Sequence, residues 1–326
     1  MAMPDGLPVD QRSPRSIGAS EVTGLEAGTQ ALRATDYRHG GEFCLTALDA
    51  LIRAGDQMLT ASASGKVRRQ LYVALADLHN VAGWAYFDAG FANRARTRFC
   101  HALVLAGLGR HAGLTANVCY RLGRVCLHQE SLDEASAYFQ LGQLAAKQSG
   151  DEIGGSILSM NSAWTWAKKG SWDGARTQLD RGRGQFADAD HTRVPDWARF
   201  FTAADLSALT GAVHTDLART VDRQHARTAV PLLVEAIDGY GDDMARSRAF
   251  SLILLSTNHL VEGDVDQGVD IGFQALVSAG TLGSARVRDR IRPLAAHARR
   301  HGSHGGAREL AARVSAMPAP PAGGLP

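Results

Sequence analysis

The sequence has little cysteine, very little lysine and no long hydrophobic run. Its 326 residues include four cysteines, none of them in a CxxC pair. This spacing argues against a zinc site or a redox pair, so we expect Cys44, Cys100, Cys119 and Cys126 to be buried thiols. No stretch reaches the roughly 18 apolar residues that span a bilayer, and the first twenty residues lack the apolar segment of a signal peptide. These absences predict a cytoplasmic protein without membrane contact.

An excess of one charge sign is also lacking, since the formal net charge is +2. A field this weak does not favour nucleic-acid binding by the whole molecule. The glycines of GLGRHAG, at residues 107–113, lie between two expected helices and not after a strand, so they predict a turn and not a dinucleotide fingerprint. No GxxxxGK[ST] loop, GxSxG elbow or HExxH frame occurs. We therefore predict no metal, no cofactor and no catalytic residue. An acid-base pair in FADADHTRVPDW, at Asp188 and Asp190 beside His191, is the weaker alternative to a turn there.

What the sequence does contain is a repeat. At 45% hydrophobic residues the chain can bury a sizeable core. Small residues recur at a spacing of 40 positions, and a large apolar residue follows each set. The small residues are Gly83, Gly123 and Ala163 at the first site and Ala95, Ala135 and Ala175 at the second, followed by Phe99, Phe139 and Leu179. This order predicts antiparallel helix pairs whose backbones approach closely at the small residues.

The repeat continues on both sides of these three copies. A fourth copy includes Ala204 and Gly211, with its second helix delayed to residues 229–236, which predicts an insertion near residues 214–226. A fifth copy includes Gly263, Gly268 and Ala275, and residues 19–56 also have a helical pattern. The order of small and aromatic residues resembles the tetratricopeptide repeat, although that repeat has a period of about 34 residues. We expect an all-α, tetratricopeptide-like α-solenoid over residues 17–314, with disordered tails at 1–16 and 315–326.

Two stretches have a narrower resemblance. RSIGASEVTGLEAGTQALRATDYRHGG and LADLHNVAGWAYFDAGFANRARTRFCHALVLA resemble the start of the regulatory region in actinobacterial transcription regulators. Those regulators have an amino-terminal Xre-type helix-turn-helix followed by tetratricopeptide repeats. The resemblance implies a sensing module that binds a peptide, a small effector or a partner protein. The residues before position 17 are too few and too rich in proline for a helix-turn-helix. The chain is then either a stand-alone relative or lacks that domain, and direct nucleic-acid binding is not expected.

A binding groove is expected on the concave face of the solenoid, which the first helix of each pair lines. Its asparagines can bond a peptide backbone, its arginine can bind a carboxylate, and its aromatic residues supply apolar area. The predicted groove consists of Asp77, Asn80, Trp84, Asn117, Tyr120, Arg124, His128, Trp164, Lys168, Phe201 and Asp205. The alternative is that the aromatic residues are core between repeats and the polar ones are solvated.

The carboxyl end is rich in arginine. Residues 284–314 contain eight arginines against Asp289 and Glu309. Arg286, Arg290, Arg299 and Arg300 are a candidate basic docking surface, and a solvated capping helix is the favoured alternative. We expect a non-enzymatic sensor or adaptor for a peptide or protein partner, in transcriptional regulation or signalling, and a homodimer is compatible with that role. A constitutive scaffold without an effector is the alternative function.

Overall fold

A computed structural model describes residues 16–282 and 284–318. Within these ranges the chain is all-helical and forms no named strand; its one β-bridge joins Ser16 to Ser62. Two short 3-10 turns, η1 (Gly41–Cys44) and η2 (Asp242–Met244), precede helices. The α-helices are α1 (Ala19–His39), α2 (Leu45–Met58), α3 (Gly65–Asp88), α4 (Ala92–Leu108), α5 (Ala112–His128), α6 (Leu132–Ser149), α7 (Glu152–Lys168), α8 (Trp172–Asp188), α9 (Ala203–Thr220), α10 (His225–Gly239), α11 (Ala245–Glu262), α12 (Val265–Thr281), α13 (Ala285–Arg299) and α14 (Gly305–Ser315).

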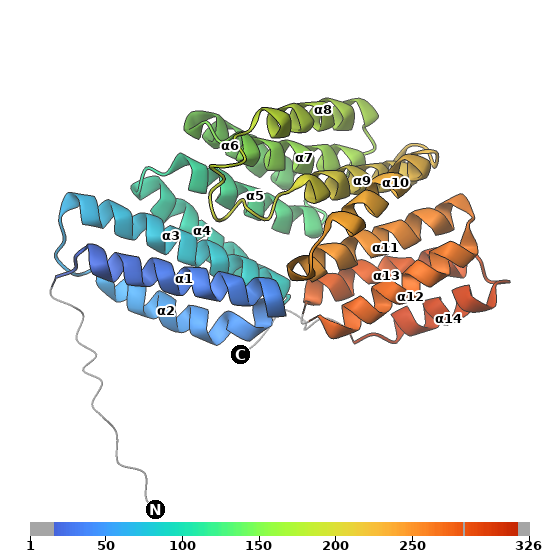
Figure 1. Ribbon diagram of the computed structural model, residues 1–326, viewed down its shortest axis with the longest axis horizontal. Coiled ribbons are helices and arrows are strands. Elements are labelled where there is room, and N and C mark those ends of the chain that lie inside the picture. Colours follow the sequence, from blue (N-terminus) through green and yellow to red (C-terminus); the bar gives the residue numbers. More distant parts are fainter. Residues whose placement is uncertain (1–15, 283, 319–326) are drawn as a thin grey trace, which may run out of the picture.

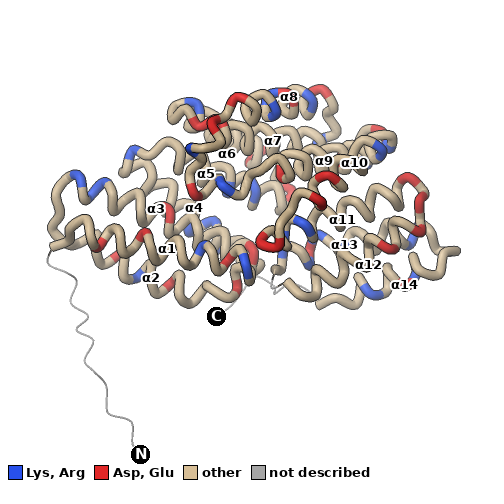
Figure 2. Tube along the Cα trace, in the orientation of Figure 1, with Lys and Arg blue, Asp and Glu red and all other residues tan. Residues whose placement is uncertain are grey.

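Successive helices pack in pairs, and the pairs follow one another in an arch. The arch runs from α1 and α2 at one end, over α7 and α8, to α13 and α14 at the other end (Figure 1). Residues of both charge signs are interspersed along the arch (Figure 2). In the described part of the chain, no helix is both long and apolar enough to cross a membrane.

The predicted small-residue contacts hold the pairs together. A Cβ atom added at Gly83 would lie 2.6 Å from Cε1 of Phe99, and one added at Gly123 would lie 2.3 Å from Cε1 of Phe139. Real Cβ atoms do not approach other atoms this closely, so each ring occupies the space that the missing side chain leaves. Both phenylalanines are fully buried. The 40-residue spacing therefore reflects the same packing in α3–α4 and α5–α6.

The turns inside three successive pairs also repeat: each ends in a residue with positive φ, which is glycine in two of them and glutamate in the third. Gly90 and Gly170 have φ of 95° and 74° at the end of their turns. Glu130, at the same position in the pair between them, has φ of 59°, and Arg110 has φ of 53° in the α4–α5 turn. Left-handed backbone strains a residue with a Cβ atom by about 1 kcal/mol. These two turns are therefore local sites of strain.

The predicted insertion near residues 214–226 is wrong. Helix α9 continues through Thr220 and α10 begins at His225, so their connection is short. The extra residues lie before α9, at 189–202, where Pro195 and a run of turns interrupt the helical pattern. The side chains of Trp197, Phe200 and Phe201 anchor this segment against the core.

The expectation of four buried thiols holds for three of them. Cys44, Cys119 and Cys126 are buried, and burial raises the pKa of the Cys119 and Cys126 thiols to about 11. Cys100 is exposed, because it directly follows the buried Phe99 and therefore lies about 100° further around α4. The predicted tails fall almost entirely outside the described residues, which include only Ser16 of the first and 315–318 of the second.

Candidate functional site

The first helices of the pairs enclose a cavity of about 130 Å³, which we call the inner chamber. Six helices, α3, α5, α7, α9, α11 and α13, each contribute side chains to its wall, and α1 adds Tyr37. More than half of the residues in the wall are arginines or aromatic residues. The arginines are Arg121, Arg124, Arg246, Arg286 and Arg290, and the rings include Trp84, Tyr120, Trp164, Phe200 and Phe250.

The arginines lie against the rings. The guanidinium carbon of Arg286 is 4.4 Å from the ring centre of Trp84, and that of Arg124 is 4.8 Å from the ring centre of Trp164. Arg290 lies between two rings, 4.7 Å from the centres of both Trp164 and Phe250. Such stacking holds a guanidinium plane in a fixed orientation and leaves its edge open for hydrogen bonds. The chamber therefore presents guanidinium edges from orientations set by the fold.

Three of these arginines have no carboxylate partner in the part of the chain that the structure describes. Among the described residues, Arg121, Arg124 and Arg290 form no ion pair. Arg121 donates to the carbonyl of Asn80 at 2.8 Å, and Arg124 donates to Oδ1 of Asn161 at 2.9 Å. Nε of Arg121 is buried without a hydrogen-bond partner. The positive charge at this end of the chamber is consequently uncompensated.

Burial changes the pKa values of two of these arginines. Burial lowers the pKa of Arg124 to about 10 and lowers the pKa of Arg290 well below its usual value, and the neighbouring arginines add to the effect on Arg290. A buried cation without a partner is costly in free energy. Charged groups with strongly perturbed pKa values in a cavity mark a candidate functional site.

A buried ion cluster joins the two ends of the arch beside the chamber. Asp88, at the end of α3, is fully buried; it lies 2.6 Å from Nη1 of Arg246 and 3.0 Å from Nε of Arg286. It also accepts a hydrogen bond of 2.8 Å from Oγ of Ser284. Burial opposes ionisation of Asp88, but the charges of Arg246 and Arg286 outweigh it and hold its pKa below the usual value. Asp36 of α1 shares Arg246 at 3.4 Å.

The opposite end of the chamber is acidic. Asp205, in the first turn of α9, accepts long hydrogen bonds from Thr202 and from the hydroxyl of Tyr240. Burial raises the pKa of Asp205 to about 6. The exposed Asp243 lies at the rim of this end. The chamber thus has a cationic end, near α5 and α13, and an acidic end, near the start of α9.

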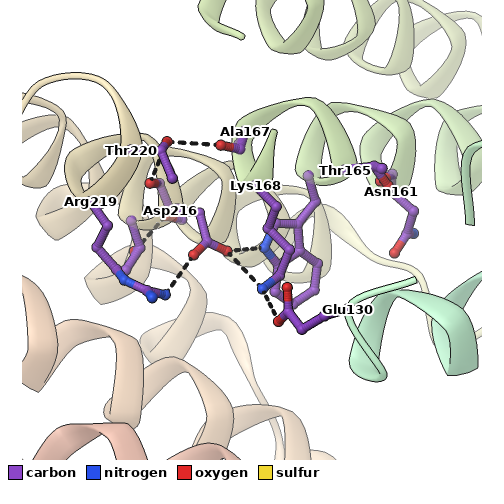
Figure 3. Close-up of polar contacts among 11 residues, drawn as sticks. Glu130, Asn161, Thr165, Ala167, Lys168, Asp216, Arg219 and Thr220 are labelled. Atoms are coloured by element: carbon purple, nitrogen blue, oxygen red, sulfur yellow. Dashed lines mark hydrogen bonds and ion pairs between the residues drawn. The ribbon is translucent and has the colours of Figure 1, made fainter. Parts of the chain in front are cut away.

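A second cavity of about 470 Å³, the outer vestibule, adjoins the cationic end. It shares Trp164, Phe250, Leu254 and Arg290 with the chamber. Figure 3 shows Asp216 of α9 between Lys168 and Arg219. Asp216 accepts from Nε1 of Trp164 at 2.5 Å and from Arg219 at 2.9 Å. The charged groups of the vestibule are therefore largely paired with one another, unlike those of the chamber.

The structure brings most of the predicted groove residues to these two cavities. Trp84, Tyr120, Arg124, Trp164, Phe201 and Asp205 line the chamber, and His128 and Lys168 line the vestibule. Several are bound to protein groups. Lys168 donates to Glu130 at 2.7 Å, and His128 lies 3.4 Å from Asp289.

Three predicted groove residues lie away from both cavities. Asp77 is paired with Arg33 at 2.6 Å, and Asn80 donates to Asn117 at 2.9 Å. These contacts link α1, α3 and α5 and leave the three side chains with protein partners. Their predicted role in ligand binding stays a prediction.

The predicted basic docking residues separate into two places. Arg286 and Arg290 point inward and line the chamber, whereas Arg299 and Arg300 at the end of α13 are exposed. They do not form one surface, because α13 packs one of its faces against α11 and α3. Asp190 and His191 lie in the exposed turn after α8, where Asp190 accepts from the backbone of Thr192 at 2.9 Å, as a turn residue would.

Sequence reasoning missed several residues of the chamber. Arg121 lies one helical turn before Arg124 and shares its face, so the helical period contained that signal. Arg246, Phe250 and Phe200 carried no such signal, because they reach the chamber from distant segments. The same holds for Asp88, which pairs with Arg246 beside the chamber. Among the described residues, no group of three or more histidine, cysteine, aspartate or glutamate side chains is arranged to hold a metal ion.

No model of a protein family matches the chain, and no curated protein matches it.

Proposed function

We propose that the chain is a non-enzymatic sensor or adaptor, built as a tetratricopeptide-like α-solenoid, that binds its ligand in the inner chamber. The observation that carries this proposal is the convergence of Arg121, Arg124 and Arg290, without carboxylate partners, in a cavity with aromatic walls. A structural role alone would favour pairing these charges or replacing them by apolar residues. A ligand with an acidic group, such as a peptide carboxyl end or a small effector, would supply the missing partner.

The regulatory part of the proposal rests on the resemblance to the sensing regions of Xre-type regulators. The ligand contacts helices from both ends of the arch, since the chamber wall combines α3 and α5 with α11 and α13. A ligand that binds better to one curvature of the arch shifts the population toward it. That shift would be the signal passed to a partner protein.

The test is a thermal-shift screen of small organic acids and of tripeptides, each tripeptide paired with its carboxyl-terminal amide. A ligand at a hundred times its Kd stabilises the native state by about 2.7 kcal/mol, which shifts Tm by several degrees. We expect a stabilising acid whose effect disappears in Arg124→Gln and persists in the control Arg300→Gln, an exposed position on the same module. If no acid or peptide stabilises the protein, the sensor proposal fails.

A constitutive scaffold is the second candidate, and one observation favours it. Apolar side chains on the second helices α4 and α6 are exposed: Val104 at 63%, Leu108 at 53%, Leu141 at 55% and Leu144 at 69%. Neighbouring exposed apolar residues are typical of protein contacts. This function predicts that Leu144→Ser abolishes partner capture, while Arg124→Gln leaves capture unchanged.

A further inference from the structure

The chemistry of the inner chamber narrows the class of ligand, an inference that rests on the proposed function. We propose that the chamber binds an organic acid with a flat apolar body of about ten to twelve non-hydrogen atoms and one or two carboxylates. Three properties of the wall lead to this class: its charge balance, its rings and its volume.

The charge balance requires an anion of low charge. Asp36 and Asp88 balance Arg246 and Arg286, which leaves Arg121, Arg124 and Arg290 without acidic partners among the described residues. Each guanidinium has five N–H donors in a planar fork that matches a carboxylate. Asp205 and Asp243 at the far end of the chamber repel a highly charged ligand. One or two negative charges therefore fit, and a polyphosphate does not.

The rings require a flat body. Trp84, Trp164 and Phe250 hold the arginine planes, and Tyr120 stacks on Phe200 with ring centres 6.1 Å apart. The wall between the two ends is apolar, because Ala208, Leu209 and Ala212 of α9 line it. An unsaturated ring gains from offset stacking and edge contacts with such walls, and an aliphatic chain of the same length gains less.

The volume sets the size. A cavity of about 130 Å³ is close to the cavity of roughly 150 Å³ that holds one benzene ring. One ring therefore fills the chamber, and its carboxylates would reach Arg290, which also lines the adjoining vestibule. A nucleotide or a peptide of several residues exceeds it, although the adjoining vestibule of about 470 Å³ extends the space beyond Arg290.

Isothermal titration of the full chain tests the inference with four probes. Isophthalate combines the flat ring with two carboxylates, and isophthalamide keeps its shape without charge. Glutarate has two carboxylates without the ring, and inorganic phosphate has charge alone. We expect isophthalate to bind with a Kd near or below about 0.1 mM, glutarate about tenfold more weakly, and isophthalamide and phosphate at least a hundredfold more weakly.

Two variants locate the binding. Arg124→Gln and Arg290→Gln should each weaken isophthalate binding at least thirtyfold, since each removes one guanidinium partner of the carboxylate, buried at Arg124 and half-buried at Arg290. Arg300→Gln should leave binding unchanged. Circular dichroism checks that each variant folds; if one does not fold, the other and the comparison of acid with amide decide.

The outcomes separate this inference from the proposed function. The inference is overturned if isophthalate and isophthalamide bind with the same Kd. It is also overturned if both arginine variants fold and bind isophthalate with the Kd of the wild type. If isophthalate fails to bind but a peptide or other acid in the thermal-shift screen stabilises the protein, the ligand class is wrong and the sensor proposal stands. If neither binds, both fail.

Discussion

The buried carboxylate of Asp88 should stabilise the fold through its two arginine partners, and Asp88→Asn tests this. The side chain is fully buried and contacts Arg246, Arg286, Ser284 and the backbone N–H of Gly41. An amide has no charge and keeps only one acceptor oxygen, so the variant leaves Arg286 unpaired and Arg246 with Asp36 alone. Removing one partner from a buried pair costs about 3–5 kcal/mol. At about 2 °C per kcal/mol, the lower end for long chains, Tm should fall by roughly 6–10 °C.

The assay is thermal unfolding followed by circular dichroism, with a double variant to separate charge from packing. Asp88→Leu combined with Arg286→Met removes one charge of each sign and leaves Arg246 paired with Asp36. Because apolar replacement of a buried pair is often neutral, the double variant should recover at least half of the lost stability. If the double variant is as unstable as Asp88→Asn, or if Asp88→Asn changes Tm by less than 2 °C, the charge argument is wrong.

The remaining predictions concern packing, turns and pH. Gly123→Ala should destabilise the protein by about 1–3 kcal/mol, because its Cβ atom would meet the Phe139 ring. Gly184→Ala on α8 should stabilise it by up to about 1 kcal/mol, because a Cβ atom there has no neighbour within 4 Å. Urea unfolding measures both free energies, and equal effects of the two variants would contradict the packing argument. Arg110→Gly should stabilise by up to about 1 kcal/mol in the same assay by relieving its φ of 53°, and a loss of stability would show that the turn is not strained. Burial, with the neighbouring His225, lowers the pKa of His214 to about 4. Between pH 4 and 6.5 the folded state then binds fewer protons at His214 than the unfolded state does. The free energy of unfolding is therefore highest above pH 6.5 and decreases as the pH falls toward 4. His214→Gln should reduce the loss of stability between pH 7 and pH 5 by about 2 kcal/mol, and an unchanged loss would contradict the lowered pKa.

The helices of the middle pairs could be predicted from the sequence because their signals are local. Gly83 and Phe99 lie within one pair, so their spacing reports the packing directly. The predicted insertion after residue 213 failed because the sequence pattern did not distinguish a long turn within a pair from one between pairs. Residues 189–202 are held by rings that contact distant helices, and no local pattern encodes such contacts.

The candidate site was predictable only in part, for a related reason. Arg124, Trp164 and Tyr120 follow the helical period of α5 and α7 and were expected to face inward. Arg290 was expected on the surface, because a helix rich in arginine is usually exposed to solvent. It points inward because the curvature of the arch places α13 near α3 and α5, where the Arg290 side chain packs against the Trp164 and Phe250 rings. The curvature of the arch depends on the packing of all the helix pairs, so no local sequence pattern predicts it.

The closure of the arch through Asp88 and Arg286 also has a consequence for synthesis. In an open solenoid each pair needs only its neighbours, so the site of an early pair could form while later pairs are still being made. Here α3 and α5 form one side of the chamber wall and α13, nearly two hundred residues later, forms the other. The ribosome adds about 5–20 residues per second, so the early helices wait ten seconds or more for Arg286 and Arg290. Until Arg246 is synthesised the carboxylate of Asp88 has neither of its arginines, and until Arg286 follows it has only one of them.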